Sequence, residues 1–553
     1  MKKLLLFLVI VFCLNGNAQT WQWAESATGT GSNEGYSVAT DTAGNIFAVG
    51  SCLIPTVFGT YTLTNGSAGH SNVFITKYDS SGTVLWAKSA GGGGNDNGYS
   101  VSTDAAGNAF MIGYLFSPAI TFGTYTLTNA GAVNMFLVKY DANGNVLWAK
   151  KAGGTSNDFG NSVATDAIGN SFVTGSFQSP SITFDTYTLT NTSGVHVFIA
   201  KYDANGNTLW AKNSGGTNGA GNSIGTDAIG NVFVTGRFSS PTITFGTYTL
   251  NNAGTYNNVF IAKYDANGNV LWAKSAGGVG NGTYGDVAYS VSIDAMGNAF
   301  VVGYFSSPTI TFGTYTLTNA GTNSNVFVTK YDSNGNILWA KSAGGVGSGL
   351  TSGDVAYSVS ADNDGNAFVS GGFYSPTITF GTYTLTPPMG SVDRMFLVKY
   401  DANGNVLCAS ALASGGDDNS GVSADRFGNA YIASDFYANP FVVGSTTLIL
   451  TGTENIYVAK YHCSLGNNSI KEYSNNNEQI NIYPNPNNGS FNIETSNSEK
   501  QTIQIVNVTG KLVLNKSIEG KINIDITNLL EGVYNISLIN STGVINKRLV
   551  IVK

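Results

Sequence analysis

A segment of 61 to 68 residues, repeated along most of this 553-residue chain, limits what the chain can fold into. Each unit contains an Asp-x-x-Gly-Asn element and, further on, a Lys-Tyr-Asp element, which is degenerate in the seventh unit at Lys460-Tyr461-His462. The first element begins at Asp41, Asp104, Asp166, Asp227, Asp294, Asp362 and Asp425. Repeats of this length indicate supersecondary units that bury their apolar faces against their neighbours.

The pattern of each unit predicts four antiparallel strands. In the fourth unit, alternation and turn residues predict strands over residues 223–227, 232–238, 258–265 and 269–275. The Asn, Asp and Gly residues between paired strands supply the positive φ that tight turns require. Radially repeated four-stranded units are typical of a β-propeller. The sequence therefore predicts an all-β fold, a seven-bladed β-propeller over residues 19–466.

The last unit lacks a fourth strand. The other units end in Val-Leu-Trp-Ala-Lys or a close variant, and residues 21–27 carry the same pattern ahead of the first unit. We therefore expect the N-terminal strand to complete the seventh blade, so that the ring has no large unpaired edge. The residues in the tryptophan slot of the first six units are Trp86, Trp148, Trp210, Trp272, Trp339 and Cys408.

The repeated motifs also resemble a known family. Asp-Ala-x-Gly-Asn, Phe-Val-x-Gly, Phe-Ile-Ala-Lys-Tyr-Asp and Gly-Asn-x-Leu-Trp-Ala-Lys are similar to the SBBP-type β-propeller repeat, over roughly residues 20–463. The resemblance implies the fold, and because that family is largely uncharacterised it implies little about function.

The N-terminus has the features of an export signal. Lys2 and Lys3 precede an apolar run from Leu4 to Leu14, and small residues end at Ala18. This run is too short to span a membrane, so residues 1–18 are predicted to be a cleaved signal peptide. No later stretch is long and apolar enough for a span, and we expect no transmembrane segment in the mature chain.

Three cysteines remain after the predicted cleavage, which is too few for a disulfide framework. They allow at most one pair and one free thiol, and the sequence leaves the pairing open. They are Cys52, Cys408 and Cys463.

The composition changes after the repeats. Residues 467–478 are polar and Asn-rich, as in a linker, and seven short apolar alternations follow in residues 479–553. This pattern predicts a small Ig-like β-sandwich. The sandwich has seven Lys and Arg against five Asp and Glu, a net charge of +2, whereas residues 19–466 have 16 against 26, a net charge of −10.

The C-terminal segment carries a second resemblance. Its Tyr-Pro-Asn-Pro opening at Tyr483, the Val-Thr-Gly-Lys-Leu-Val run from Val508 and the Lys-Arg-Leu-Val-Ile-Val-Lys end closely resemble the type A sorting domain of the type IX secretion system. The resemblance implies that residues 479–553 engage the type IX secretion machinery after passage through the periplasm. In that family the domain is commonly removed, and the cargo is released or attached to surface lipopolysaccharide. We expect a secreted or outer cell-surface protein.

Residues suited to chemistry are scarce. Charged residues are 11% of the chain and the formal net charge is −7, without the Lys/Arg cluster that nucleic-acid binding requires. The three histidines (His70, His196 and His462) have no metal-ligand spacing, and there is no Gly-x-Ser-x-Gly elbow, phosphate loop or Cys-x-x-Cys. We read Lys-Tyr-Asp-x-Asn-Gly-Asn as a capped turn with a packed tryptophan, rather than as a calcium loop, a sialidase Asp box or a quinoprotein motif.

Two faces of the predicted propeller differ. The turns between first and second strands and between third and fourth strands are nearly constant and form what we call the turn face. The connections from each fourth strand to the next first strand vary and, with the connections between second and third strands, form the loop face. Loops on a rigid scaffold commonly carry binding sites. Acidic candidates for ligand binding in these loops are Asp96, Asp158, Asp286, Asp354, Asp417 and Asp418.

The predicted function is a binding or structural module rather than an enzyme. Its extracellular ligand, a glycan or a protein, is not identified by the sequence. Acidic loops without a nearby base favour positively charged groups, and calcium is the ion that such oxygen ligands suit; otherwise we expect no cofactor. The alternative is a secreted carbohydrate-active enzyme with a carboxylate pair on the loop face.

Overall fold

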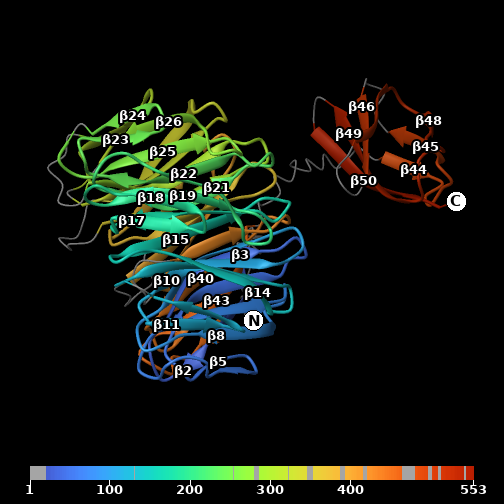
Figure 1. Ribbon diagram of the computed structural model, residues 1–553. Coiled ribbons are helices and arrows are strands. Elements are labelled where there is room, and N and C mark those ends of the chain that lie inside the picture. Colours follow the sequence, from blue (N-terminus) through green and yellow to red (C-terminus); the bar gives the residue numbers. More distant parts are fainter. Residues whose placement is uncertain are drawn as a thin grey trace, which may run out of the picture. The chain divides into compact units, whose positions relative to one another are not determined.

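The computed structural model describes residues 20–129, 131–252, 254–278, 285–319, 321, 323–345, 353–386, 393–414, 420–463, 480–495, 501–507, 512–540 and 543–552. The chain divides into two compact units, Gln19–Cys463 and a second unit that contains Ser464–Lys553. Figure 1 shows both units as β-structure. The predicted signal peptide and linker lie outside the described residues.

Within the described residues of Gln19–Cys463, the main strands form seven four-stranded antiparallel sheets. The first strands are β3 (Asn33–Thr40), β9 (Asn97–Thr103), β15 (Asp158–Thr165), β21 (Gly219–Thr226), β27 (Asp286–Ile293), β33 (Val355–Ala361) and β39 (Gly421–Ala424). The second strands are β4 (Ile46–Cys52), β10 (Ala109–Leu115), β16 (Ser171–Phe177), β22 (Val232–Phe238), β28 (Ala299–Phe305), β34 (Ala367–Gly372) and β40 (Asn429–Phe436).

The outer half of each sheet repeats in the same way. The third strands are β7 (Asn72–Tyr78), β13 (Asn134–Tyr140), β19 (His196–Tyr202), β25 (Asn258–Tyr264), β31 (Asn325–Tyr331), β37 (Asp393–Tyr400) and β43 (Asn455–His462). The fourth strands are β8 (Val84–Ala90), β14 (Val146–Ala152), β20 (Thr208–Asn213), β26 (Val270–Ala276), β32 (Ile337–Ala343), β38 (Val406–Ser414) and β1 (Thr20–Ser26).

A short hairpin connects the second and third strands of each sheet, where the sequence suggested only a connection. The first hairpin also pairs with β2 (Thr28–Gly29). The hairpins are β5 (Thr56–Phe58) with β6 (Tyr61–Leu63), β11 (Ala119–Phe122) with β12 (Tyr125–Thr128), β17 (Ser181–Phe184) with β18 (Tyr187–Thr190), β23 (Thr242–Phe245) with β24 (Tyr248–Asn251), β29 (Thr309–Phe312) with β30 (Tyr315–Thr318), β35 (Ile378–Phe380) with β36 (Tyr383–Leu385), and β41 (Phe441–Val443) with β42 (Thr446–Leu448).

The first strands form the inner edge of a propeller-like arrangement. They contact one another in the order β3, β9, β15, β21, β27, β33, β39, and β39 in turn contacts β3. In Figure 1 the orange strands β40 and β43 accordingly lie beside the blue strand β3. Strands that meet their equivalents on both sides lie where the sheets converge, so side chains on the first strands lie closest to one another.

The hydrophobic core lies between neighbouring sheets. One cluster, for example, joins Phe47 and Ile75 of one sheet to Met111 and Phe136 of the next, with Trp86 between them. Apolar contact of this kind is non-directional, so it holds the sheets together without fixing how they are aligned.

A polar contact fixes the alignment of neighbouring sheets. Trp148 on a fourth strand donates from Nε1 to the carbonyl oxygen of Ala204, at 3.1 Å, in the turn of the next sheet. Gly206 in that turn has a φ of 84°, and a Cβ there would lie 2.9 Å from the Trp148 ring. Glycine is thus needed both for the turn and for the close approach. Equivalent bonds are made by Trp23, Trp86, Trp210, Trp272 and Trp339.

The N-terminal strand belongs to the last sheet. β1 pairs antiparallel with β43, with Ala24 opposite Ala459, so the sheet order is β1, β43, β40, β39. Trp23 on β1 then donates to the carbonyl oxygen of Ser80 at 3.2 Å, in the turn of the first sheet. The first described strand of the chain therefore joins its last repeat to its first.

Cys408 forms a disulfide bond with Cys463, at a Cα–Cα distance of 6.2 Å. Cys408 occupies the slot that holds tryptophan in the other fourth strands, and Cys463 follows directly after β43. The last sheet takes β1 as its fourth strand, so no turn connects its third strand to its fourth as in the other sheets. A covalent bond links the sixth and seventh sheets at this point. Cys52 is a free, buried cysteine.

The second unit is a β domain with two sheets. One contains β44 (Ile480–Tyr483), β45 (Ser490–Thr495) and β48 (Ile522–Asp525), and the other contains β46 (Gln501–Asn507), β47 (Leu512–Ile518), β49 (Gly532–Asn540) and β50 (Gly543–Ile551). Both contribute to one core that includes Phe491, Ile505, Ile536 and Leu549. The unit has its own hydrophobic core, as an independent domain requires.

Deletion of residues 21–27 should destabilise the first unit and promote its aggregation. The deletion removes β1 and exposes the backbone donors and acceptors of β43, and unpaired strand edges are templates for association. Thermal unfolding and size-exclusion chromatography would measure both effects, with a chain that begins at Gln19 as the control. Equal melting temperature and equal solubility of the two chains would contradict this role of β1.

Candidate functional site

The loop face is held together by buried aspartates. Asp158, the first residue of β15, accepts hydrogen bonds from the backbone N–H groups of Gly154 (2.7 Å), Gln178 (3.1 Å) and Ser179 (3.1 Å) and from the Ser179 hydroxyl (2.6 Å). The Gly154 bond spans the loop that precedes β15, and the other bonds reach the connection between the second and third strands. One carboxylate thus joins the two kinds of loop that form this face.

The same arrangement recurs at three other predicted site residues. Asp96, Asp286 and Asp354 each accept a bond from a glycine N–H and three bonds from the connection after the second strand, including one from a serine hydroxyl. All four aspartates are 0% exposed. A carboxylate with its acceptor positions occupied is a structural element rather than a free ligand.

The structure buries four of the six acidic residues that the sequence suggested as ligand-binding candidates. Asp96, Asp158, Asp286 and Asp354 position the loops and are covered by them. Asp417 and Asp418 lie outside the described residues. Whether the loop face binds a ligand stays a prediction; Glu34, near the start of β3, is half-buried, in contrast to these four aspartates.

Burial affects the acidity of these groups. The pKa values of Asp96, Asp286 and Asp354 are raised because desolvation disfavours the charged form, and the hydrogen bonds offset part of this effect. On the turn face the balance is opposite. Desolvation of Asp203 is outweighed by hydrogen bonds from Asn207, Asn205 and Gly206, and its pKa is lowered.

A β-bulge shapes the inner edge of the loop face. In β9, Gly98 and Ser100 pair with consecutive residues of β10, so Tyr99 between them is an extra residue. A Cβ at Gly113 on β10 would collide with the carbonyl oxygen of Asn97, which explains the glycine in the repeated Phe-Val-x-Gly motif. Bulges commonly re-aim a side chain beside a functional site. The extra residues in the six bulged sheets are Tyr36, Tyr99, Asn161, Asn222, Tyr289 and Tyr357.

Several bulge residues contact the neighbouring sheet beside or at its own bulge. Asn161 donates to the carbonyl oxygen of Gly221 at 2.9 Å, and Asn222 donates to that of Ala288 at 2.8 Å. Tyr36 stacks on Tyr99 with ring centroids 4.9 Å apart and planes within 3°. Several bulge residues therefore connect the inner edge of their own sheet to that of the next sheet.

An aromatic cluster forms where the first three sheets meet on the loop face. The rings of Tyr99 and Tyr114 lie 5.2 Å apart, and Phe159 meets Tyr114 edge-on at 5.3 Å. Phe116, also edge-on to Tyr114 at 5.6 Å, is 47% exposed. We call Tyr36, Tyr99, Tyr114, Phe116 and Phe159 the tyrosine cluster. Sequence analysis did not identify it, because only Tyr36 and Tyr99 share a position in their repeats and the other three rings occupy different positions.

The turn face is built from hydrogen-bonded caps. Asp141, for example, accepts from the N–H groups of Asn143 (2.9 Å) and Asn145 (2.8 Å), and from the Asn145 side chain (2.8 Å). Gly144 in the same turn has a φ of 81°. This arrangement agrees with the turn-capping interpretation of the repeated Asp-x-Asn-Gly-Asn segment.

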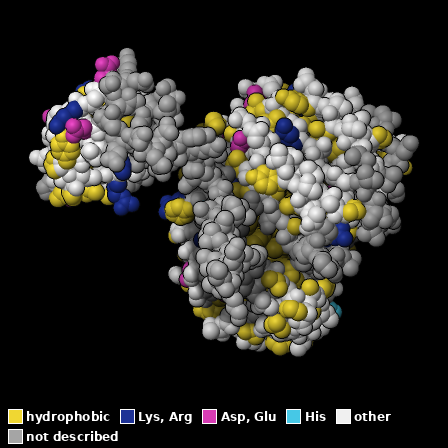
Figure 2. All heavy atoms as spheres, turned by 180° about the vertical axis from the view of Figure 1, so that it is seen from behind, with side chains coloured by type: hydrophobic (Ala, Val, Ile, Leu, Met, Phe, Trp, Pro, Cys, Tyr) yellow, Lys and Arg dark blue, Asp and Glu magenta, His cyan; other side chains and the backbone are white. Residues whose placement is uncertain are grey.

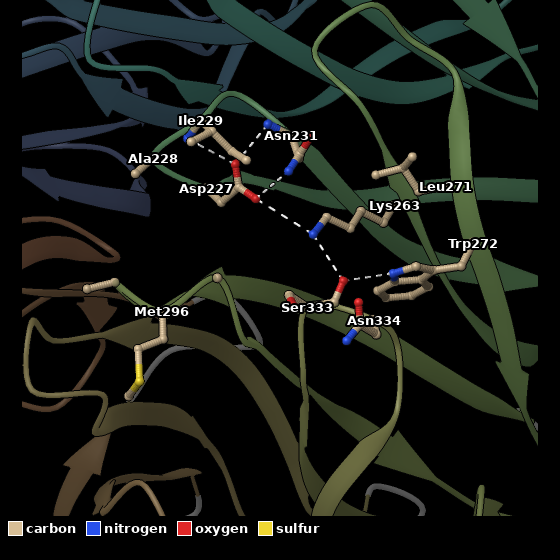
Figure 3. Close-up of a pocket in the computed structure, with 12 residues that line it drawn as sticks. Asp227, Ala228, Ile229, Asn231, Lys263, Leu271, Trp272, Met296, Ser333 and Asn334 are labelled. Atoms are coloured by element: carbon tan, nitrogen blue, oxygen red, sulfur yellow. Dashed lines mark hydrogen bonds and ion pairs between the residues drawn. The ribbon is translucent and has the colours of Figure 1, made fainter.

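A cavity of about 630 Å³ opens on the turn face between two sheets. Figure 3 shows its polar side chains pointing toward one another: Lys263 Nζ lies 3.7 Å from Asp227 Oδ2 and 3.1 Å from the carbonyl oxygen of Ser333. Trp272 donates to the same carbonyl at 3.1 Å. These groups satisfy one another, and because four other sheets repeat the Lys–Asp pair, we assign the contacts to sheet alignment.

No group of three or more His, Cys, Asp or Glu side chains suited to a metal ion occurs in the part of the chain that the structure describes. In the same residues, no helix has the length and apolarity of a membrane span. On the face shown in Figure 2, the coloured lysine and arginine side chains are scattered rather than joined in a continuous patch.

Comparison with known families identifies the second unit. Residues 481–552 match the family described as a secretion system C-terminal sorting domain. The chain therefore carries a C-terminal domain of the type IX secretion system, which implies interaction with that machinery and a secreted or outer-surface location.

Similarity to individual proteins is more distant. Over 524 residues the chain is 26% identical to an uncharacterized WD repeat-containing protein, L264, of Acanthamoeba polyphaga mimivirus, covering 76% of this chain and 37% of that protein. A 114-residue match of 28% identity to the regulatory protein FlaEY of Caulobacter vibrioides covers 20% and 12%. The chain thus spans well under half the length of either relative.

Solved structures give weak matches. A fungal alcohol oxidase in complex with copper has a TM-score of 0.38 at 11% identity, covering 97% of this chain and 100% of that one. A europium-containing methanol dehydrogenase has a TM-score of 0.30 at 11% identity, covering 80% and 93%. Scores this low carry no argument about activity. The sheets and the family match together define an all-β protein of repeated, propeller-like units with a secretion sorting domain.

The two kinds of aspartate should respond to pH with opposite sign. Asp354 has a raised pKa, so its contribution to stability is present below about pH 3.8, the unfolded value, and is lost as pH rises through the folded value. Asp203 has a lowered pKa, so its contribution is present above that value and is lost as pH falls.

Urea unfolding of Asp354→Asn and Asp203→Asn between pH 3 and pH 7 tests this difference. We expect Asp354→Asn to lose about 1–3 kcal/mol, because buried donors lose their acceptor, and to lose more at pH 3 than at pH 7. The loss in Asp203→Asn should be greater at pH 7. The same pH trend in both variants would contradict the assignment.

Proposed function

We propose that this protein is a secreted or cell-surface seven-bladed β-propeller that acts as a binding or structural module, exported by type IX secretion. The match of residues 481–552 to the sorting domain carries the export part of the proposal. The signal peptide over residues 1–18 and the linker over 467–478 complete the proposed organisation.

The propeller assignment is supported by the cyclic contacts of the first strands and by the pairing of β1 with β43. Each of the seven first strands in the described residues contacts two other first strands, so the series of contacts has no end. The repeated motifs resemble the SBBP type, and we propose that the propeller is of this kind.

The loop face is the proposed binding surface. The turn face repeats the same caps and lysine contacts from sheet to sheet, so its structure serves alignment. The loop face differs between sheets in length, in bulge residue and in aromatic content, and variable loops on a rigid scaffold commonly carry binding sites. We propose an extracellular ligand there, and its buried aspartates hold the loops in place.

Removal of residues 479–553 should leave the propeller folded and trapped in the periplasm, because each unit has its own hydrophobic core. Cell fractionation and surface labelling in a bacterium with a type IX system would measure this. As the matched control, residues 464–553 fused to a periplasmic reporter with the same signal peptide should carry the reporter to the outside. Normal surface levels of the truncated protein would overturn the proposal.

A further inference from the structure

We propose that the tyrosine cluster and Glu34 form a binding site for an organic cation, a quaternary ammonium or guanidinium group, on the loop face of the first three sheets. This inference rests on the proposed function of the propeller as a binding module and names the chemistry of its ligand. In this proposal the ligand contacts half-buried groups at the inner edge of the sheets, and the buried aspartates do not contact it.

The aromatic rings provide the first half of such a site. Tyr36, Tyr99, Tyr114 and Phe159 are half-buried, and Phe116 is exposed. Tyr114 meets Phe116 and Phe159 edge-on, at 77° and 87° between ring planes. Phe116 is accessible to solvent at the edge of this packed group, and the negative face of an aromatic ring attracts organic cations.

Glu34 provides the charge. Its carboxylate accepts a short hydrogen bond from the Tyr36 hydroxyl, and it lies on β3 beside the bulge that positions Tyr36. Among the described residues, Glu34 forms no ion pair with a lysine or arginine. A half-buried carboxylate without a cation next to it is suited to bind one from solution.

The neighbouring groups keep this charge in place. Burial, followed by the charge of Glu34, raises the pKa of Tyr36, so the phenol stays neutral and donates to the carboxylate. Asn97 donates to the Tyr114 hydroxyl at 2.7 Å and so fixes the ring at the centre of the cluster. The cluster is therefore preorganised, which lowers the entropic cost of binding.

The chain contains an internal comparison. Tyr289 and Tyr357 are bulge residues of neighbouring sheets that also contact each other, with ring centroids 5.6 Å apart. At the position of Glu34 this pair has Val287, which is fully buried and apolar. The two tyrosine pairs thus differ in the carboxylate, and we assign cation binding to the pair that has it.

The chemistry also separates an organic cation from calcium. Calcium needs six to eight oxygen ligands, whereas the described cluster offers one carboxylate surrounded by rings. An ammonium or guanidinium group gains from both the ring faces and the carboxylate. The net charge of −10 over residues 19–466 adds a long-range attraction for cations.

Isothermal titration calorimetry on the mature full chain tests the site. The probes are tetramethylammonium and arginine amide as the two organic cations, calcium chloride as the inorganic cation, and maltose as a neutral sugar. We expect saturable binding of one or both organic cations, weakened about ten-fold or more by Glu34→Gln and by Tyr99→Ala. The matched control variants, Tyr289→Ala in the second tyrosine pair and Asp203→Asn on the turn face, should bind with unchanged affinity.

Circular dichroism and thermal unfolding show whether each variant is folded. Tyr36→Phe is a second test for the case in which Tyr99→Ala does not fold, since it keeps the ring and removes only the bond to Glu34; we expect weaker binding. Binding of maltose that is lost in Tyr99→Ala and kept in Glu34→Gln would overturn the cation assignment in favour of a glycan. If neither organic cation binds, the cation assignment is wrong. The proposed export is tested separately, by cell fractionation, and does not depend on this result.

Discussion

The structure of the repeated unit depends on one contact between neighbouring sheets. On six of the seven fourth strands a tryptophan lies against a turn glycine of the next sheet and donates to a carbonyl of that turn, as Trp148 does at Gly206 and Ala204. Apolar packing brings the sheets together, and this hydrogen bond fixes their alignment, because it forms only at one relative position. The Lys-Tyr-Asp element adds a second tie, since Lys139 contacts both Asp104 of its own sheet, at 3.5 Å, and Ala204 of the next, at 3.2 Å.

The contact between sheets is special at the two junctions of the seventh sheet, where the repeats begin and end. Trp23 on β1 makes the ordinary bond to the first sheet, so the N-terminal strand carries the pattern across the junction. In the seventh sheet no turn connects the third strand, β43, to the fourth strand, β1, and there the Cys408–Cys463 disulfide takes the place of the tryptophan. By closing a loop over a sequence separation of 55 residues, this bond restricts the unfolded chain, which is worth about 4 kcal/mol in the loop-entropy account. An oxidising, extracellular location suits such a bond.

Much of the fold could be predicted from the sequence, and the candidate site could not. The four strands of each unit follow from alternation and turn residues, and β1 followed from the missing tryptophan strand. The hairpins between second and third strands were missed because residues 242–250 were interpreted as a connection, although Ile243 and Phe245 alternate and are buried.

The burial of Asp158 was missed too, and its constant spacing of eight residues from Asp166 was the available signal for a structural role. The bulges left no signal, because Tyr99 and Asn161 share a position and differ in type. Contacts between sheets, such as Tyr36 with Tyr99, depend on tertiary structure alone.

Hydrogen exchange of the mature full chain tests the central claim, that the N-terminal strand is part of a closed ring of sheets. The account predicts that those amides between Trp23 and Ser26 that are hydrogen-bonded to β43 exchange as slowly as the paired amides between Tyr457 and Lys460, because these bonds open only when the whole unit unfolds. Rapid exchange of the N-terminal amides, while those of β43 remain protected, would show that β1 is not an integral strand and would contradict the account.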